Sequence, residues 1–149
     1  MSLITTYAKS HYRTIKTGET INWIDENLDP DSGEWLSRRI LEDWGWRNDK
    51  AGYERGKDYN HSTFCDLVIR GTCGVEICED QKLVVNPLVP ENEWAYFRLD
   101  ELPYLNHKIT IVYDKDGCHY NEGKGLWVEI DGKKAAESTE ISKLTISFS

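Results

Sequence analysis

The pattern of apolar residues along the chain changes near Gly74. Before it, apolar residues recur at intervals of three or four, as on one face of an amphipathic helix. After it, short β-branched segments alternate apolar and polar residues and end at turn-forming pairs. The sequence therefore predicts an α+β chain, in which residues 1–75 form a helical segment and residues 76–149 form a small antiparallel β sheet or sandwich.

Three helices are predicted in the first half. The first covers residues 4–16 and ends before Gly18. The second covers about residues 33–44. The third, short and buried, begins after a capping side chain at Asn60 or Ser62. The apolar face of the first helix is made by Tyr7, His11, Tyr12 and Ile15, and that of the third by Phe64, Leu67 and Val68.

Five strands are predicted in the second half, at residues 82–85, 94–99, 108–113, 125–130 and 143–148. Apolar and polar residues alternate from Ile109 to Asp114, which indicates a strand with one buried face. Asp116-Gly117 and Asp131-Gly132 are typical of hairpin turns. These features favour an antiparallel sheet.

Composition limits the possible partners. Charged residues make up 30% of the 149 residues and the formal net charge is −8. Phosphate backbones and anionic membranes bind clusters of Lys and Arg, so we expect neither nucleic acid nor membrane partners. The sequence has no run of about 18 apolar residues and no visible secretory signal, so we expect a cytoplasmic protein.

The cysteines predict neither a metal site nor a disulfide framework. Their positions include no Cys-x-x-Cys pair, so a zinc site is not expected. We expect four free thiols, with Cys65 buried in the third helix. No cofactor is predicted. The four cysteines are Cys65, Cys73, Cys78 and Cys118.

Five carboxylates gather around the strong turn at Asp29-Pro30-Asp31-Ser32-Gly33. Crowded carboxylates raise one another's pKa, which suits acid–base chemistry or calcium binding, although the spacing is not that of an EF-hand. A merely solvated turn is the alternative. The carboxylates are Asp25, Glu26, Asp29, Asp31 and Glu34, and they are flanked by Trp23 and Trp35.

A second polar cluster precedes the third helix. It is a candidate sugar pocket, and the alternative is a set of loop and cap hydrogen bonds. Trp23 and Trp35 are candidate platforms for sugar rings, with core packing as their alternative. The pocket candidates are Asp58, Tyr59, Asn60 and His61.

Three segments resemble the C-terminal part of bacterial glycoside hydrolases, namely residues 58–69, 84–90 and 94–97. The likeness is to mannosylglycerate hydrolase-like and glycoside hydrolase family 63-like enzymes, and it continues over roughly residues 20–135. It implies an (α/α)-barrel catalytic domain followed by a β-rich tail. The first half of this chain would then be the end of the barrel.

The resemblance extends to residues 26–33, which are similar to a Glu-x-aromatic-Asp/Asn-Pro-x-Thr-Gly segment that carries the general base of inverting glycosidases. Glu26 is the matching position, and Leu28 stands where many relatives have an aromatic residue. The resemblance places the general acid on an Asp far upstream. We therefore expect a terminal piece of a carbohydrate-active hydrolase that is inactive without its missing catalytic domain.

Two other classes of function remain open. One is a non-catalytic β-rich accessory or carbohydrate-binding domain, and the other is a small interaction protein. If a catalytic domain is missing, the helical half should expose an apolar surface and the isolated chain should self-associate. The contributors to that surface would be Tyr7, Tyr12, Ile15, Trp23 and Trp44.

Overall fold

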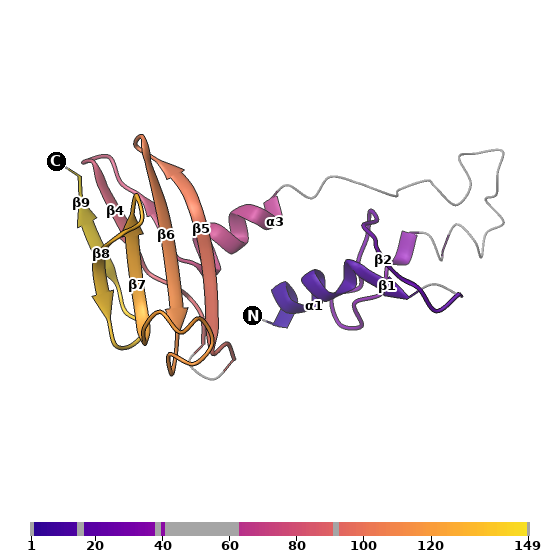
Figure 1. The fold of residues 1–149 in the computed structure, drawn as a ribbon. Helices are drawn as coiled ribbons and strands as arrows, with labels where there is room; N and C mark the ends of the chain where they lie inside the picture. Colours follow the sequence, from indigo (N-terminus) through magenta and orange to yellow (C-terminus); the bar gives the residue numbers. More distant parts are fainter. Residues whose placement is uncertain (1, 15–16, 38–39, 41–62, 91–92, 149) are drawn as a thin grey trace. The chain divides into compact units, whose positions relative to one another are not determined.

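The computed structural model describes residues 2–14, 17–37, 40, 63–90 and 93–148. The chain divides into two compact units, Met1–His61 and Ser62–Ser149, which we call the N-terminal unit and the β unit (Figure 1). Within the described segments, no helix combines the length and the apolar character needed to cross a membrane. The functional division at residue 75 stays a prediction.

The N-terminal unit begins with a helix that is shorter than predicted. Helix α1 spans Ser2–Ser10, after which strands β1 (Tyr12–Thr14) and β2 (Thr20–Asn22) form an antiparallel hairpin. The Ser10 hydroxyl and His11 Nδ1 both lie 2.8 Å from the carbonyl oxygen of Tyr7. Because that oxygen only accepts, both side chains donate to it, and they replace the backbone partner that a longer helix would supply.

The predicted helical N-terminal half is wrong. The α-helices with complete described bounds are α1 and the four-residue α3 (Thr63–Asp66), residues 36, 37 and 40 are also helical, and most of the described regular structure is β. These elements do not form the end of an (α/α) barrel. The helical spacing of apolar residues was misleading because β-branched and aromatic residues around Tyr12 also favour a strand. Most of the predicted 33–44 helix lies outside the described residues.

The third predicted helix exists but is not buried. Helix α3 continues into a π-helical segment, η3 (Leu67–Thr72), which ends where the Cys73 N–H donates to the Val68 carbonyl at 2.9 Å. Leu67 is 57% exposed and Cys65 is exposed, contrary to the prediction. All four cysteines are free, and among them only Cys73 is buried.

Two antiparallel sheets build the β unit and lie as two layers in Figure 1. The smaller has the order β3-β4-β9, from Val75–Ile77, Lys82–Val85 and Leu144–Ser147. The larger has the order β5-β6-β7-β8, from Tyr96–Tyr104, His107–Asp114, Gly125–Ile130 and Lys133–Ser138. The predicted antiparallel β character of this half is confirmed.

The five predicted strands correspond to β4, β5, β6, β7 and β9, whereas β3 and β8 were missed. The Asp131-Gly132 turn joins β7 to β8 as predicted, with both φ angles positive. Asp116-Gly117 lies instead inside a long connection between β6 and β7. A Leu105-Asn106 turn with positive φ at both residues joins β5 to β6, and it lacks the glycine that would have revealed it.

Strand β6 is buried on both faces. One face contributes Ile109, Ile111 and Tyr113 to the apolar core, as predicted. The opposite face is also covered, since Val112 is inaccessible and Asp114 is 1% exposed. The long connection between β6 and β7 folds back over this outer face, where its His119 and Tyr120 N–H groups donate to Asp114.

Candidate functional site

The acidic turn of the N-terminal unit is a closed hydrogen-bonded loop. Leu28 and Trp35 pair across it as an isolated antiparallel bridge. Asp29 Oδ1 accepts the backbone N–H groups of Asp31 and Ser32 at 2.9 and 3.1 Å, and the Gly33 N–H donates to the Asp29 carbonyl at 2.8 Å. Asp29 is therefore the residue that holds the turn closed.

Glu26 differs from the neighbouring acids in its surroundings. Asp25 is completely buried, and its Oδ1 accepts the Glu26 N–H at 2.8 Å. Asp29 is committed to the turn, whereas the Glu26 side chain is exposed. Of these three carboxylates, Glu26 is the exposed one, and its role as general base stays a prediction.

The two tryptophans that flank the acidic turn make packing contacts. The Trp35 indole N–H donates to the Ser10 carbonyl at 2.9 Å, and its ring meets those of Tyr7 and His11 edge-on at 6.1 and 5.9 Å. The Arg13 guanidinium lies 5.0 Å from the centre of the Trp23 ring. Both rings are only partly accessible, and their role as sugar platforms stays a prediction.

The other predicted pocket residues, Asp58, Tyr59, Asn60 and His61, lie outside the described residues. So do Ile15 and Trp44 of the expected apolar surface. Of the remaining members, Tyr12 is 69% exposed, while Tyr7 and Trp23 are partly buried. Self-association of the chain stays a prediction.

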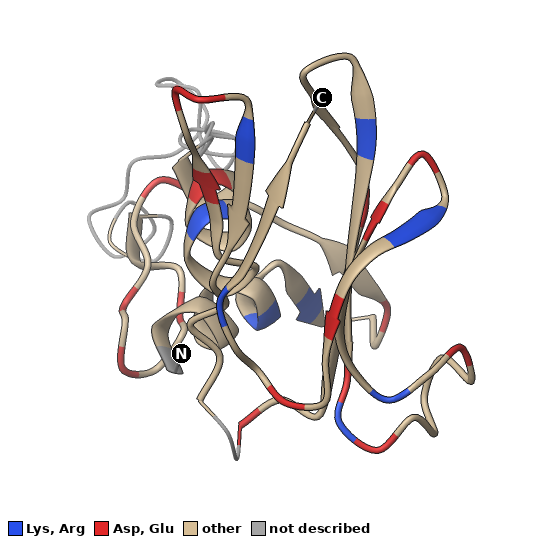
Figure 2. Cartoon of the chain, turned by 90° about the vertical axis from the view of Figure 1, so that its left-hand side faces the viewer, with Lys and Arg blue, Asp and Glu red and all other residues tan. Residues whose placement is uncertain are grey.

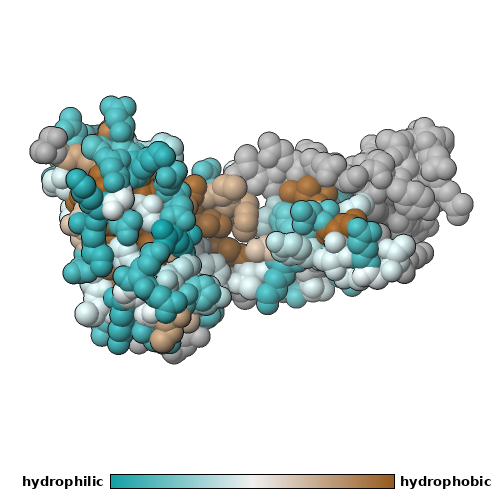
Figure 3. All heavy atoms as spheres, viewed as in Figure 1, coloured by the Kyte–Doolittle hydropathy of each residue, from teal (hydrophilic) through white to brown (hydrophobic). Residues whose placement is uncertain are grey.

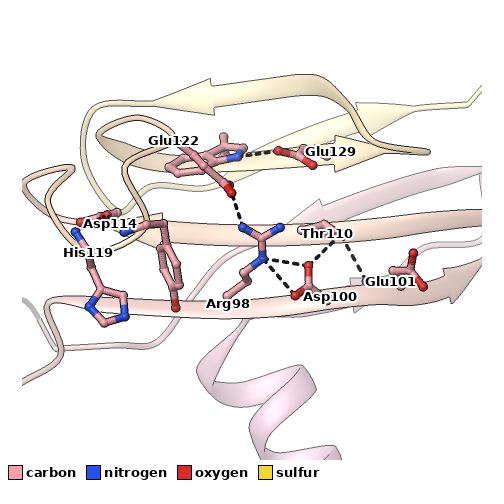
Figure 4. A network of polar contacts seen from close by, with 10 residues as sticks. Arg98, Asp100, Glu101, Thr110, Asp114, His119, Glu122 and Glu129 are labelled. Atoms are coloured by element: carbon pink, nitrogen blue, oxygen red, sulfur yellow. Dashed lines mark hydrogen bonds and ion pairs between the residues drawn. The ribbon is translucent and has the colours of Figure 1, made fainter.

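The structure reveals a polar network that the sequence reasoning missed, on the outer face of the larger sheet (Figure 4). Its anchor is Asp114, whose carboxylate accepts the N–H groups of Gly117, His119 and Tyr120 at 3.0, 3.0 and 2.8 Å. Burial by itself would raise the Asp114 pKa, but these three hydrogen bonds outweigh it and the pKa lies below its ordinary value. An ionised Asp114 thus fixes the β6–β7 connection.

That connection carries Glu122 to Arg98 on β5. Arg98 Nη1 donates to Glu122 at 2.7 Å, and Nε donates to both oxygens of Asp100 at 2.8 and 3.0 Å (Figure 4). The hydrogen bond to Asp100, followed by that to Glu122, raises the Arg98 pKa, so the guanidinium stays charged. The Tyr120 ring centre lies 5.8 Å from the guanidinium carbon.

Next to Arg98 the sheet contains a cavity of about 430 Å³, which we call the β5–β7 cavity. Strand β5 contributes Arg98, Asp100 and Glu101 to its wall. The rest of the wall comes from two neighbouring strands and a turn, through Lys108, Thr110, Glu129 and Asp131-Gly132. Three charged residues within four positions of a strand, at 98, 100 and 101, were the signal in the sequence.

Among the residues that the structure describes, basic side chains are interspersed with acidic ones. Figure 2 shows acidic residues on many of the turns, with basic residues scattered among them. The visible face of the β unit is largely hydrophilic in Figure 3. In the part of the chain that the structure describes, no group of three His, Cys, Asp or Glu side chains is arranged to hold a metal ion. The predicted absence of nucleic acid and membrane partners stays a prediction.

Comparisons with known proteins point to glycoside hydrolases. Residues 76–136 match the family described as glycosyl hydrolase family 65, C-terminal domain. The structure also resembles a solved sialidase, with a TM-score of 0.71 and 35% sequence identity over 96% of this chain. The chain spans 12% of the length of that sialidase. Together these matches support a glycoside hydrolase C-terminal domain, whereas neither of them places the chain with the family 63-like or mannosylglycerate hydrolase-like enzymes.

Proposed function

We propose that this chain is the C-terminal region of an inverting glycoside hydrolase and that Glu26 is its general base. The family match over residues 76–136 is the observation that carries the hydrolase assignment. The exposure of Glu26, beside a buried Asp25 and a turn-bound Asp29, supports the choice of base.

The chemistry requires an ionised carboxylate near the anomeric carbon. Glu26 takes a proton from a water molecule, whose oxygen attacks that carbon on the face opposite the leaving group. A carboxylic acid elsewhere in the longer polypeptide protonates the leaving oxygen, about 6.5–9.5 Å from the base, so that the water fits between them. The chain alone therefore hydrolyses no glycoside, because leaving-group protonation and substrate positioning come from outside it.

The test is Glu26→Gln in the longer polypeptide that contains this chain. Gln keeps the size of Glu but cannot take the proton, so kcat should fall by about 10²–10⁴-fold. Because Glu26 is exposed, the thermal midpoint of the Glu26→Gln protein should stay near that of the wild type. NMR of the first-formed anomer of the product would test inversion directly.

Two neighbouring substitutions serve as controls. Asp29→Asn replaces the charged acceptor of the turn by a neutral amide oxygen and should lower stability more than it lowers turnover per folded molecule. Asp25→Asn tests the buried rival in the same way. Wild-type turnover in Glu26→Gln, combined with a collapse in a folded Asp25→Asn or Asp29→Asn, would show that the base is misassigned. A product of retained configuration would reject the inverting mechanism.

A further inference from the structure

The wall of the β5–β7 cavity depends on an irregularity in strand β5. Leu99 pairs with Ile111 and Leu102 pairs with Ile109, so Asp100 and Glu101 together oppose the single residue Thr110. In a regular strand, consecutive side chains point to opposite faces. The bulge instead brings two consecutive carboxylates, those of Asp100 and Glu101, to one cavity.

The bulge is held in a conformation that does not favour glutamate. Glu101 has φ +50°, in the left-handed region that glycine adopts without strain. The Thr110 hydroxyl accepts the Glu101 N–H at 3.2 Å and donates to Asp100 at 3.4 Å (Figure 4). Glycine would satisfy the same backbone geometry, and the carboxylate that stands there instead accepts from Lys108 Nζ at 2.9 Å, with both side chains about two-thirds exposed.

Hydrogen bonds orient several of the polar groups on the cavity wall. Glu129 accepts the Trp127 indole N–H at 2.9 Å, and Asp131 accepts from His107 and from the Lys108 N–H at 2.7 and 2.9 Å. Each carboxylate has more acceptor sites than these contacts use. Arg98 donates through Nε and Nη1, and no described residue pairs with its Nη2. Donors and acceptors therefore remain available on this wall, mostly on side chains that are more than half exposed.

The chemistry of the wall selects the kind of ligand. No apolar side chain lines the cavity, and its four carboxylates outnumber the two cations, Arg98 and Lys108. Anionic ligands are repelled by such a wall, and apolar ligands gain nothing from it. Vicinal hydroxyl groups, which both donate and accept, match planar carboxylates beside a guanidinium.

We propose that the β5–β7 cavity binds a neutral sugar at a site separate from Glu26. Its volume of about 430 Å³ falls in the range of small-molecule sites, which is about 300–1,000 Å³. The choice of a sugar among polyhydroxylated compounds rests on the proposed function. The cavity gives the β unit a role in holding carbohydrate.

The test is an NMR titration of the ¹⁵N-labelled 149-residue chain with methyl glycosides of glucose, galactose and mannose. At least one should shift the amide signals of Thr110 and Gly132 with a dissociation constant of about 1 mM, at the weak end of the affinity scale. Glu101→Gly removes the carboxylate and relieves the left-handed strain. It should weaken binding at least about tenfold without lowering the thermal midpoint.

Glu137→Gln is the matched control, because Glu137 pairs with Lys134 on the same sheet and lies outside the cavity wall. It should bind as the wild type does. No shift with any of the three sugars would overturn the proposal, as would preferential binding of the anionic N-acetylneuraminic acid or unchanged binding by Glu101→Gly. These outcomes leave the hydrolase proposal intact, because that proposal is judged by the turnover of Glu26→Gln.

Discussion

Asp114→Asn should destabilise the β unit far more than a typical single substitution. The carboxylate is 1% exposed and accepts three backbone N–H groups, so it is the principal tie between the long β6–β7 connection and the sheet. Asn keeps one oxygen, which can serve the His119 and Tyr120 N–H groups. Its amide then faces the Gly117 N–H, and two donors are left opposed.

The magnitude follows from these contacts. One lost hydrogen bond to a charged acceptor costs about 1.5–3 kcal/mol, and weakening the other two from charged to neutral adds about 1 kcal/mol. The total is about 2–4 kcal/mol. For a domain of this size, that lowers the thermal midpoint by about 10–25 °C.

The pH dependence gives an independent check. Because the folded-state pKa of Asp114 lies below the ordinary value of an aspartate, its stabilisation is fully present above that ordinary value and is lost as the pH falls through the folded pKa. The difference in unfolding free energy between wild type and Asp114→Asn should therefore shrink in acid.

Urea unfolding followed by circular dichroism, at neutral pH and in acid, measures both effects. The matched control is Asp116→Asn in the same connection, because the exposed Asp116 carboxylate accepts only the Cys118 N–H, at 3.0 Å. It should cost about 0.5 kcal/mol or less. Equal costs for the two variants, or an Asp114 effect that is independent of pH, would show that Asp114 does not fix the connection.

Two further predictions concern the backbone and the thiols. Gly74→Ala should cost about 2–4 kcal/mol in unfolding free energy, because φ is +72° and a Cβ would lie 2.1 Å from the Asn86 carbonyl carbon. Gly132→Ala is the control, because φ is +75° but no atom lies within 4 Å of the added Cβ, and it should cost only about 1 kcal/mol. Similar costs for the two variants would contradict the packing argument. Burial raises the Cys73 pKa to about 11, so mass spectrometry after brief native alkylation should find Cys73 unmodified, and early modification there would refute its burial. The exposed thiols that should react first are Cys65 and Cys118.

The sequence predicted most of the β unit because its signals are local. Alternation of apolar and polar residues located β6, and the run of residues 125–130 coincides with β7. The Asp131-Gly132 pair predicted its hairpin because aspartate and glycine tolerate positive φ. The turn predicted at residues 29–33 likewise forms, and the Asp29 carboxylate holds it closed.

The same local signals failed in the N-terminal unit. Tyr7, His11 and Tyr12 have helical spacing, but the helix ends at Ser10 because side chains of Ser10 and His11 bind the Tyr7 carbonyl. Apolar spacing does not register this competition between side chain and backbone. The base assignment to Glu26 came from resemblance, and the structure adds only the exposure of its side chain.

The tertiary structure decided the polar network on the larger sheet. The network joins Arg98 on β5, Glu122 in the β6–β7 connection and Asp114 at the end of β6. It forms because that connection folds back over the sheet. The bulge at Asp100 and Glu101 is a matter of strand register, which depends on the partner strand and not on local composition. The sequence by itself thus located five of the seven strands of the β unit, whereas pairing and loop placement decided which charges share a cavity.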